Sequence, residues 1–288
     1  MIQYLRRKQI DIDKYDNCIQ NASNSRIYAL SYYLDIVADN WDALVLNDYE
    51  AVMPLPWRSK YFIRYIYTPC WTQQLGVFSI PQLSTELIDQ FTKAIPKKFL
   101  KTSIYFNSQS QPSSFVQKRD NYILDLNDSY ENLYKNYRKD RKDRLKKFLK
   151  SNATISTDTE IKELIDLFKV NYRGKTTLDL SDYNKLEILS QNDKIDFHIL
   201  KIHNSNNKLI SGSLFLKDKQ RIYYLFSANN KEGNKAQGNT AILNKIIQKY
   251  SETNYILDFE GSMIPGISSF FKSFGSHLEY YYLYVKRL

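Results

Sequence analysis

The sequence predicts an α/β protein made of two domains with similar plans. Helix-like and strand-like patterns alternate along the chain, and the second half gives the order helix, three strands, helix, strand, helix, strand. The first half shows a similar but less complete order. A length of 288 residues with 43% hydrophobic residues is enough for two cores, and only 8 glycines and 7 prolines exclude fibrous and low-complexity chains.

The first half is predicted to contain three helices and six strands. Pro54 and Pro56 confine the second strand to an edge or a bulge, because proline donates no ladder hydrogen bond. Pro96 marks the end of the third helix. The helices are expected at about 12–21, 26–39 and 84–96, and the strands at "DALVLN", "YEAVMPLPW", "YFIRYIY", "QQLGVFS", "TSIYFN" and "NYILDL".

The polar stretch "SQSQPSS" (108–114) has no periodicity and is predicted to be a loop. We therefore place the domain boundary after it, with domains at 1–114 and 115–288. After the strand "NYILDL", the second half of the chain begins with one long helix, "YENLYKNYRKDRKDRLKKFLK", whose tyrosines and leucines form an apolar stripe. Arg141 falls on that stripe, so either its stem packs while its head reaches the surface, or it points into a cleft.

This helix also holds much of the excess positive charge of the chain. The formal net charge is +10, and residues 131–150 contain nine Lys and Arg against three acids. Such a field favours a polyanion or a phosphorylated ligand, and the alternative is a solvated charged face.

The rest of the second half is predicted from the same patterns. A helix is expected at 160–173, and the loop "NNKEGNKAQG" precedes a helix at 240–250. The last helix follows the loop after "YILDF". The strands are expected at "DFHILKI", "LISGSLFLK", "RIYYLFSA", "YILDF" and "LEYYYLYV".

Several classes of protein are disfavoured by what the chain contains. Cys18 and Cys70 have no CxxC spacing, which indicates thiols in a reduced compartment, and the three histidines have no metal-ligand spacing. The N-terminal "MIQYLRRKQIDIDKY" lacks the apolar segment of a signal peptide, and no run is long enough for a membrane span. We expect a cytoplasmic protein without a metal site, of unknown oligomeric state.

"LDFEGSMIPGISSFFKSFG" (257–275) uses three of the eight glycines within one loop and helix. Gly261 allows a sharp turn at the carboxyl end of a strand, where ligands of α/β proteins bind. Gly266 follows Pro265 in the first helical turn, and Gly275 fits the position after the helix. Lys272, in the last turn, is favoured by the helix dipole whatever the function.

The order of elements in the second half resembles that of GCN5-related N-acyltransferases (GNAT). In that family a loop with the pattern Q/R-x-x-G-x-G/A precedes the central helix and binds the coenzyme A pyrophosphate through backbone amides. Here "KAQGNT" (235–240) retains only Gly238, with Lys235 and Thr240 at the other two positions. The alternative is a helix-capping loop.

The tail resembles the FemA/FemX-like peptidyl transferases, whose chains hold two GNAT-like domains in tandem. Their second domain ends with a Φ-D-Φ/G-G-S turn and a helix that closes on F-K-x-x-F/G. The basic "RLKKF" helix also resembles one at the start of that domain. The matching residues are Asp258, Phe259, Glu260, Gly261, Ser262, Phe271, Lys272, Phe274 and Gly275.

The resemblance implies transfer of an aminoacyl group from aminoacyl-tRNA to an amine, with no cofactor. In the family the acceptor is a UDP-linked peptidoglycan precursor, a cell-wall peptide, and the Phe-Lys pair meets the aminoacyl end of the tRNA. This chain lacks the lysine that often precedes the position of Trp41, which leaves Arg173 as the positional candidate for a phosphate partner.

The candidate catalytic residues are accordingly Lys272, which would stabilise the oxyanion, and Asp258, a base for the attacking amine. A small-molecule or peptide amine is the expected acceptor and tRNA the expected partner. Two alternatives remain: an acyl-CoA-dependent GNAT N-acyltransferase, and a non-catalytic module that binds an anionic ligand. The candidate substrate-binding residues are Phe271, Glu260, Gly261, Ser262, Arg141 and Arg173.

Overall fold

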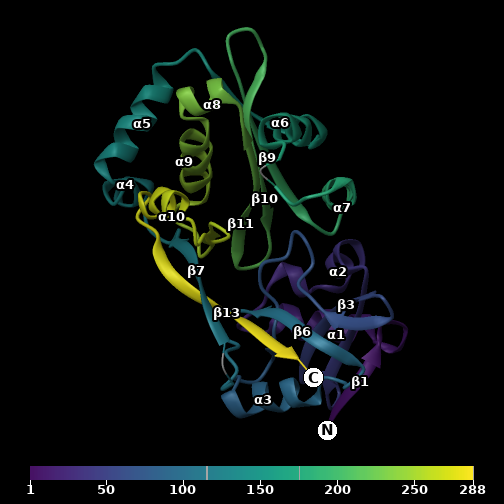
Figure 1. Cartoon of the computed structure of the whole chain (residues 1–288). Coiled ribbons are helices and arrows are strands. Elements are labelled where there is room, and N and C mark those ends of the chain that lie inside the picture. Colours follow the sequence, from purple (N-terminus) through teal and green to yellow (C-terminus); the bar gives the residue numbers. More distant parts are fainter. Residues whose placement is uncertain (115, 175, 288) are drawn as a thin grey trace. The chain divides into compact units, whose positions relative to one another are not determined.

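The computed structural model describes residues 1–114, 116–174 and 176–287. The chain forms two compact units, Met1–Asp120 with Glu279–Leu288, and Asn121–Leu278. It passes into the second unit within strand β7 (Val116–Asp125) and returns within the last strand, β13 (His277–Arg287) (Figure 1). The last strand thus completes the first unit, although it follows the second unit in the sequence.

The first unit contains a mixed sheet with strand order β1-β2-β3-β4-β6-β13, and a short strand, β5, pairs with β3. The long antiparallel pairing of β2 with β3 runs from Asn40↔Trp57 to Leu46↔Ala51. Both strands are largely buried and rich in Val, Leu and Ala, which places them inside the unit. The elements are β1 (Ile2–Arg6), α1 (Ile12–Asn21), α2 (Ser31–Val37), β2 (Asn40–Leu46), β3 (Ala51–Lys60), β4 (Ile63–Ile66), β5 (Phe78–Ser79), α3 (Thr85–Ala94) and β6 (Phe99–Phe106).

Pro54 and Pro56 lie in an interior strand and still avoid the ladder on one side. β5 pairs with β3 at Ala51 and Val52, and β4 pairs with it only from Trp57 onward. The two prolines therefore lie between these pairings, where β3 donates no backbone amide hydrogen bond to a strand on that side. The strand was expected at an edge or with a bulge, and it is instead an interior strand with a gap in its pairing on one side.

Helices α1 and α3 begin as their sequences predict. The side chain of Asp11 accepts a hydrogen bond from the Lys14 amide at the start of α1, and Ser84 does the same for the Leu87 amide of α3. α3 ends at Ala94, before Pro96, which confirms the expected end. α2 is shorter than expected.

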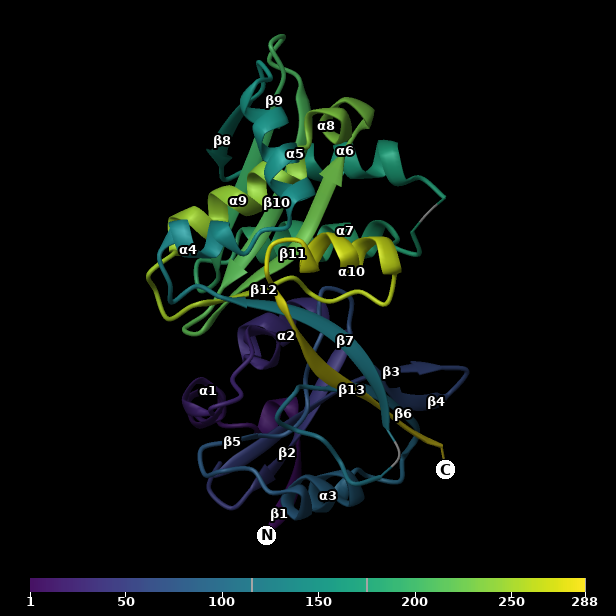
Figure 2. The same ribbon diagram turned by 90° about the vertical axis from the view of Figure 1, so that its left-hand side faces the viewer.

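The second unit contains the strand order β7-β12-β11-β10-β9-β8. Its helices lie on both faces: α5, α8 and α9 on one, and α6 and α7 on the other (Figures 1 and 2). Among the residues described, no helix has both the length and the apolar character that crossing a membrane requires. The elements are α4 (Tyr130–Lys135), α5 (Lys139–Leu149), β8 (Thr154–Asp158), α6 (Lys162–Tyr172), α7 (Leu180–Ser190), β9 (Asp196–His203), β10 (Leu209–Lys217), β11 (Arg221–Asn229), α8 (Lys231–Ala236), α9 (Gly238–Tyr250), β12 (Ile256–Asp258) and α10 (Pro265–Lys272).

The neighbouring strands β11 and β12 of this sheet pair over only a short length and then separate. β12 runs parallel to β11, and their register covers only Arg221↔Ile256 to Tyr223↔Asp258. β11 continues to Asn229, whereas the chain leaves β12 after Asp258 and turns towards α10. β12 therefore ends beside the middle of β11, where the Tyr224 ring lies 6.2 Å from that of Phe271 of α10, and the carboxyl end of such a strand is a position where α/β folds bind ligands.

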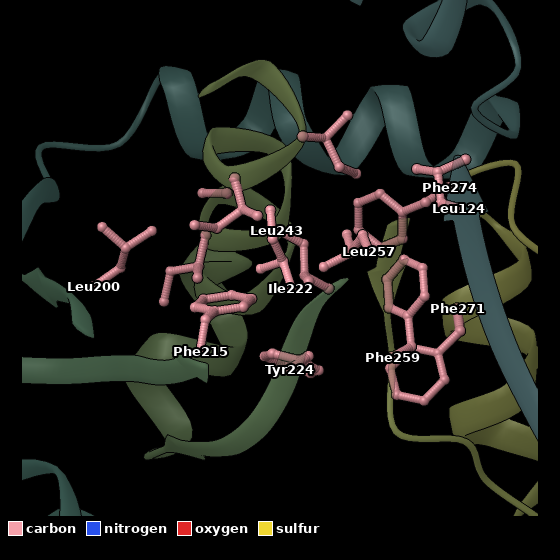
Figure 3. Close-up of a cluster of buried hydrophobic side chains, with 14 of the residues drawn as sticks. Leu124, Leu200, Phe215, Ile222, Tyr224, Leu243, Leu257, Phe259, Phe271 and Phe274 are labelled. Atoms are coloured by element: carbon pink, nitrogen blue, oxygen red, sulfur yellow. The ribbon is translucent and has the colours of Figure 1, made fainter. Parts of the chain in front are cut away.

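The core on the α9 side joins the sheet to α4, α5, α9 and α10. Phe215 and Ile222 of the sheet lie below Leu243 of α9 (Figure 3). Phe271 of α10 and Phe274, which follows that helix, close one end. α9 is apolar around much of its circumference because it is covered by α5 as well as by the sheet.

The structure also differs from the predicted elements in the split of one helix and in four additional elements. The long basic helix is two helices, because the chain breaks at 136–138, where the Arg138 amide donates to the Ser273 carbonyl of another segment. The loop expected at 229–238 contains α8, which is capped by the Asn230 side chain. β1, β8 and α7 are additional elements. α7 begins with a capping box formed by Asp179 and Asp182.

A buried lysine of β9 ties β8 and α6 to the sheet. The Lys201 side chain is 1% exposed, and its ammonium donates to Asp158 at 2.6 Å and to Glu163 at 2.8 Å. A buried cation is tolerated only with such acceptors. Hydrogen bonds from the Glu160 amide and from Lys201 hold the pKa of Asp158 at about 2.

We expect Asp158→Asn to lower the free energy of unfolding by about 1–3 kcal/mol at pH 7, because a buried charged donor loses its acidic acceptor. The depressed pKa of Asp158 means that its contribution is present above about pH 4 and is lost as the pH falls through about 2. Denaturant unfolding at pH 7 and pH 2.5 measures this: the gap between wild type and variant should narrow in acid. A gap that is independent of pH would contradict the ion-pair account. Glu163→Gln, at the more exposed acid, is the matched control and should cost less.

Candidate functional site

A cavity of about 480 Å³ opens at the start of α9 in the second unit. It has three arginines and one acid, so its lining is strongly basic. Three segments that are distant in the sequence form its walls: the beginning of α5, the α8–α9 junction and α10. The lining residues are Arg138, Asp140, Arg141, Arg144, Asn234, Gln237, Gly238, Asn239, Thr240, Gly266, Ser269 and Phe270.

The three arginines reach this cavity because they are three residues apart at the start of one helix. Residues at steps of three lie on one side of a helix. Arg138 pairs with Asp140 through two hydrogen bonds, and this pairing lowers the pKa of Asp140 to about 2. Arg144 donates to the Gln237 side chain at 3.0 Å. One arginine is thus balanced by an acid, and two positive charges remain in excess.

Arg141 is the buried member of the group, with 4% of its surface exposed. Its guanidinium donates to Ser273 Oγ at 2.7 Å and to Thr240 Oγ1 at 2.5 Å, and both acceptors are neutral hydroxyls. It also lies over the rings of Phe270 and Phe274, at 4.4 and 5.1 Å from their centroids. Burial lowers its pKa to about 10. Of the two expectations for Arg141, the structure shows the head inside, at the cavity wall.

A buried cation with neutral partners favours an anion in the space beside it. Removing a guanidinium from water costs free energy, and an anion at hydrogen-bond distance recovers much of that cost. The start of α9 adds to this preference. Gln237 precedes the helix with φ 68° and gives no side-chain cap, so the first amides of α9 point towards the cavity at the positive end of the helix dipole.

The glycines of this region are required for packing. A Cβ on Gly238 would lie 2.5 Å from the Ser211 side chain, and a Cβ on Gly233 would lie 2.1 Å from the Ile210 carbonyl oxygen. Both glycines thus let α8 and the start of α9 approach β10. The alternatives for Gly238 were a phosphate loop and a helix-capping loop, and its close contact with β10 shows that it has a packing role.

The amides before α9 are used inside the chain. Gly233 donates to the Asn230 side chain at 2.8 Å, Asn234 to the Asn230 carbonyl at 3.0 Å, and Gln237 to the Asn234 carbonyl at 3.2 Å. In place of an open loop of free amides, α8 presents a short helix. The anion-binding groups of this cavity are therefore mainly the arginine side chains and the first turn of α9.

α10 carries the Phe-Lys pair, and its two members have different surroundings. Phe271 is 5% exposed and packs in the core, with its ring centroid 5.0 Å from that of Phe259 (Figure 3). Lys272 is exposed, and its ammonium lies 5.3 Å from the centroid of the Tyr122 ring. Ser269 and Phe270, one turn earlier, line the cavity. The structure thus offers Lys272 to solvent beside the cavity-lining turn and makes Phe271 a packing residue.

Asp258 lies at the end of β12 and is 1% exposed. Its carboxylate accepts from Arg221 at 2.8 Å, and also from the Asn121 side chain and the Glu260 amide, both at 3.0 Å. These bonds fix the turn in which Glu260 and Gly261 both have positive φ, of 63° and 66°. The sharp turn expected at Gly261 is present.

The remaining candidates are distributed between two places. Ser262 accepts a hydrogen bond from the Ile264 amide at 3.0 Å and so shapes the entry to α10. Arg173 directly follows α6, and α6 lies on the opposite face of the sheet from α9 (Figure 1). The structure therefore brings Arg141 to the cavity, places Lys272 on a cavity-forming helix, and does not bring Arg173 there.

Sequence reasoning did not single out Arg138, Arg144 or Ser269. The signal for the two arginines is present in the chain, since Arg138, Arg141 and Arg144 recur at every third position. The spacing alone does not reveal a cavity, because the other walls come from α9 and α10, which are distant in the sequence.

Comparison with solved structures identifies the architecture. FemX matches with a TM-score of 0.68 and 14% sequence identity, over 99% of this chain and 97% of FemX. The chain has the FemX fold. L-PGS from Bacillus licheniformis matches with a TM-score of 0.62 and 12% identity, over 96% of this chain and 92% of that one. A GCN5-related N-acetyltransferase from Sphaerobacter thermophilus matches with a TM-score of 0.50 and 9% identity, over 99% and 95%.

No protein-family model and no curated protein sequence matches the chain. The FemX-like fold therefore rests on structure, and it confirms the predicted α/β class with two GNAT-like domains. In this FemX-like fold the basic cavity lies at the start of the second unit's α9, the helix whose preceding loop was compared with the GNAT phosphate loop.

Proposed function

We propose that this protein is a Fem-type N-acyltransferase that transfers an aminoacyl group from aminoacyl-tRNA to an amine. One observation carries the proposal: a cavity with three arginines at the start of a helix, in a chain with the FemX fold. A phosphate of the donor would occupy this cavity. The acceptor would be an amine of a small molecule or of a cell-wall peptide precursor, and it would meet the acyl group where β12 ends and the chain leaves β11.

The details of the cavity favour a polynucleotide over coenzyme A as the donor. A pyrophosphate cradle needs several free amides in the loop before the helix. Here those amides are bonded within α8, whereas guanidinium groups supply the positive charge. Arginine side chains suit the separate phosphodiesters of an extended RNA end, because each guanidinium can contact one phosphate.

The chemistry requires positioning and charge stabilisation. The acceptor nitrogen bonds to the ester carbonyl carbon, the bond from that carbon to the ribose oxygen breaks, and the ribose oxygen receives the proton that the amine loses. Lys272 would stabilise the negative charge that develops on the carbonyl oxygen. Asp258, bonded to Arg221 and to the Glu260 amide, would position the β12 turn rather than accept the proton.

The test is binding of charged tRNA to Arg138→Gln/Arg144→Gln. We expect weaker binding. The slope of log K against log salt, which is negative, should become shallower by about 0.7–0.9 for each lost phosphate contact. Fluorescence anisotropy at four salt concentrations gives both quantities. Lys146→Gln/Lys147→Gln is the matched control, because it removes the same charge from exposed positions of α5 that do not line the cavity. If the two double variants weakened binding equally, tRNA would be attracted by the overall positive charge of α5, and the assignment of the cavity as the phosphate site would be wrong.

Acyl-CoA is the second candidate donor, favoured by the left-handed Gln237 followed by Gly238 at the start of α9. Because the preceding amides are engaged, we expect a dissociation constant for acyl-CoA weaker than about 10 μM, roughly −7 kcal/mol. Calorimetric titration measures it. Tighter binding would indicate that acyl-CoA is the donor. If neither donor were turned over with any of a panel of amines, the protein would be a non-catalytic module that binds an anion.

A further inference from the structure

The hairpin between β3 and β4 in the first unit ends in two exposed aromatic residues. Tyr61 is 83% exposed and Phe62 is fully exposed, at 106% of the reference surface. Lys60 pairs with Ile63, so these aromatics form a two-residue turn. Ile63 is 47% exposed. Figure 2 shows this hairpin at the right, extending from the first unit.

The turn has an unusual choice of residues. Both Tyr61 and Phe62 have positive φ, of 50° and 64°. Two-residue hairpin turns with this geometry strongly favour Asn-Gly, because a bulky side chain is strained at positive φ. Neither aromatic ring is buried by the fold in return. Other residues would therefore make this turn more stable. The exposed rings indicate a contact with another molecule.

Positive charges surround this apolar tip. Lys60 and Arg64 flank the turn, and the Lys60 ammonium lies 5.5 Å from the centroid of the Tyr61 ring. β4 pairs with β6 in parallel, with Arg64 beside Phe99 and Tyr65 beside Lys101. The start of β6 thereby adds exposed bases, and Leu100 there is 47% exposed. The exposed bases of this patch are Lys60, Arg64, Lys97 and Lys101, whereas the Lys98 ammonium donates to the Tyr4 hydroxyl of β1.

We infer that this hairpin docks on the surface of an anionic lipid bilayer. Tyrosine and phenylalanine rings at a loop tip suit the boundary between headgroups and acyl chains, where one end of the side chain is apolar and the other wet. Lysine and arginine set back from the tip would meet the lipid phosphates while their stems stay in the apolar layer. This docking surface lies in the first unit and does not depend on the transfer activity proposed for the second.

The test is cosedimentation with vesicles of phosphatidylcholine that contain 30% phosphatidylglycerol, against vesicles of phosphatidylcholine alone. We expect the wild type to bind the anionic vesicles and Tyr61→Asn/Phe62→Gly to bind at least tenfold more weakly. The same double variant should melt at the same or a higher temperature, because Asn-Gly relieves the strained turn. Val170→Ser removes another exposed apolar residue, 79% exposed on α6, and should bind as the wild type does.

A second arm separates the charges from the rings. Lys60→Gln/Arg64→Gln should weaken binding to anionic vesicles by about fivefold for each base, an effect that disappears at high salt. Lys146→Gln/Lys147→Gln, on α5 of the second unit, is the control for non-specific attraction of a basic protein. In Phe62→Trp the indole emission should shift to the blue when anionic vesicles are added.

Two results would overturn the inference. One is equal vesicle binding by wild type and Tyr61→Asn/Phe62→Gly, which would assign any binding to the general charge of the protein. The other is self-association of the wild type, in sedimentation without vesicles, that the same variant abolishes. That result would make a second copy of this chain the partner of the hairpin.

Discussion

Lys272→Met is expected to lower the rate of acyl transfer by about 100-fold or more, while the fold remains nearly as stable. Loss of a cation that stabilises a developing oxyanion typically has an effect of this size. Lys272 is exposed in the last turn of α10, so its structural contribution is limited to the helix dipole and to its contact with the Tyr122 ring. The dipole term is about 0.3–1 kcal/mol.

The measurement is paired: single-turnover transfer rate and melting temperature for each variant. Phe271→Ala is the packing control, because Phe271 is 5% exposed in the core and its truncation should cost about 3–5 kcal/mol of stability. Lys272→Arg keeps the charge and should recover part of the rate. If Lys272→Met turned over like the wild type, the catalytic role would be withdrawn. If it unfolded instead, Lys272 would be a structural residue.

Gly233→Ala should destabilise the second unit by about 3 kcal/mol or more. Its Cβ would lie 2.1 Å from the Ile210 carbonyl oxygen, which is backbone of β10 and cannot rotate away. The gain in helix propensity from alanine is at most about 1 kcal/mol, so the clash decides the sign. Relief of the clash moves α8 away from the sheet, so anion binding at the start of α9 should weaken as well.

Gly266→Ala is the matched control, since a Cβ at that position meets nothing within 4 Å. Gly266 also lines the cavity. Comparing the two variants therefore distinguishes the effect of a packing clash from the effect of an added methyl group in the cavity. Urea unfolding should place Gly233→Ala well below the wild type and Gly266→Ala at or slightly above it. A Gly233→Ala protein of wild-type stability would show that α8 does not approach β10 as closely as described.

Local sequence signals were sufficient where a single segment determines its own conformation. The pattern of α1, with an Asp at its N-cap, gave both of its ends, and Pro96 gave the end of α3. The turn at Gly261 was predicted from its place between a strand and a helix, and its φ of 66° agrees. The order of the strands in the second half predicted the GNAT-like arrangement that FemX shares.

The candidate site was less predictable because it is assembled from distant segments. The position of the Arg141 head depends on hydroxyls of Thr240 and Ser273, about a hundred or more residues later. The break between α4 and α5 depends on the Ser273 carbonyl, and an uninterrupted helical pattern does not reveal it. The need for glycine at Gly233 follows only from the approach of β10.

The return of β13 to the first unit has a consequence for biosynthesis. β13 pairs with β6 from Tyr282↔Phe106 to Arg287↔Lys101, so β6 gains this neighbour only when the last strand leaves the ribosome. Until then the nascent first unit exposes an unpaired strand edge, which is prone to wrong pairing. The second unit, formed from one continuous stretch, can fold earlier. We therefore expect the unit that is translated first to be completed last, so that a ribosome stalled shortly before β13 carries a folded second unit and an unfinished first one.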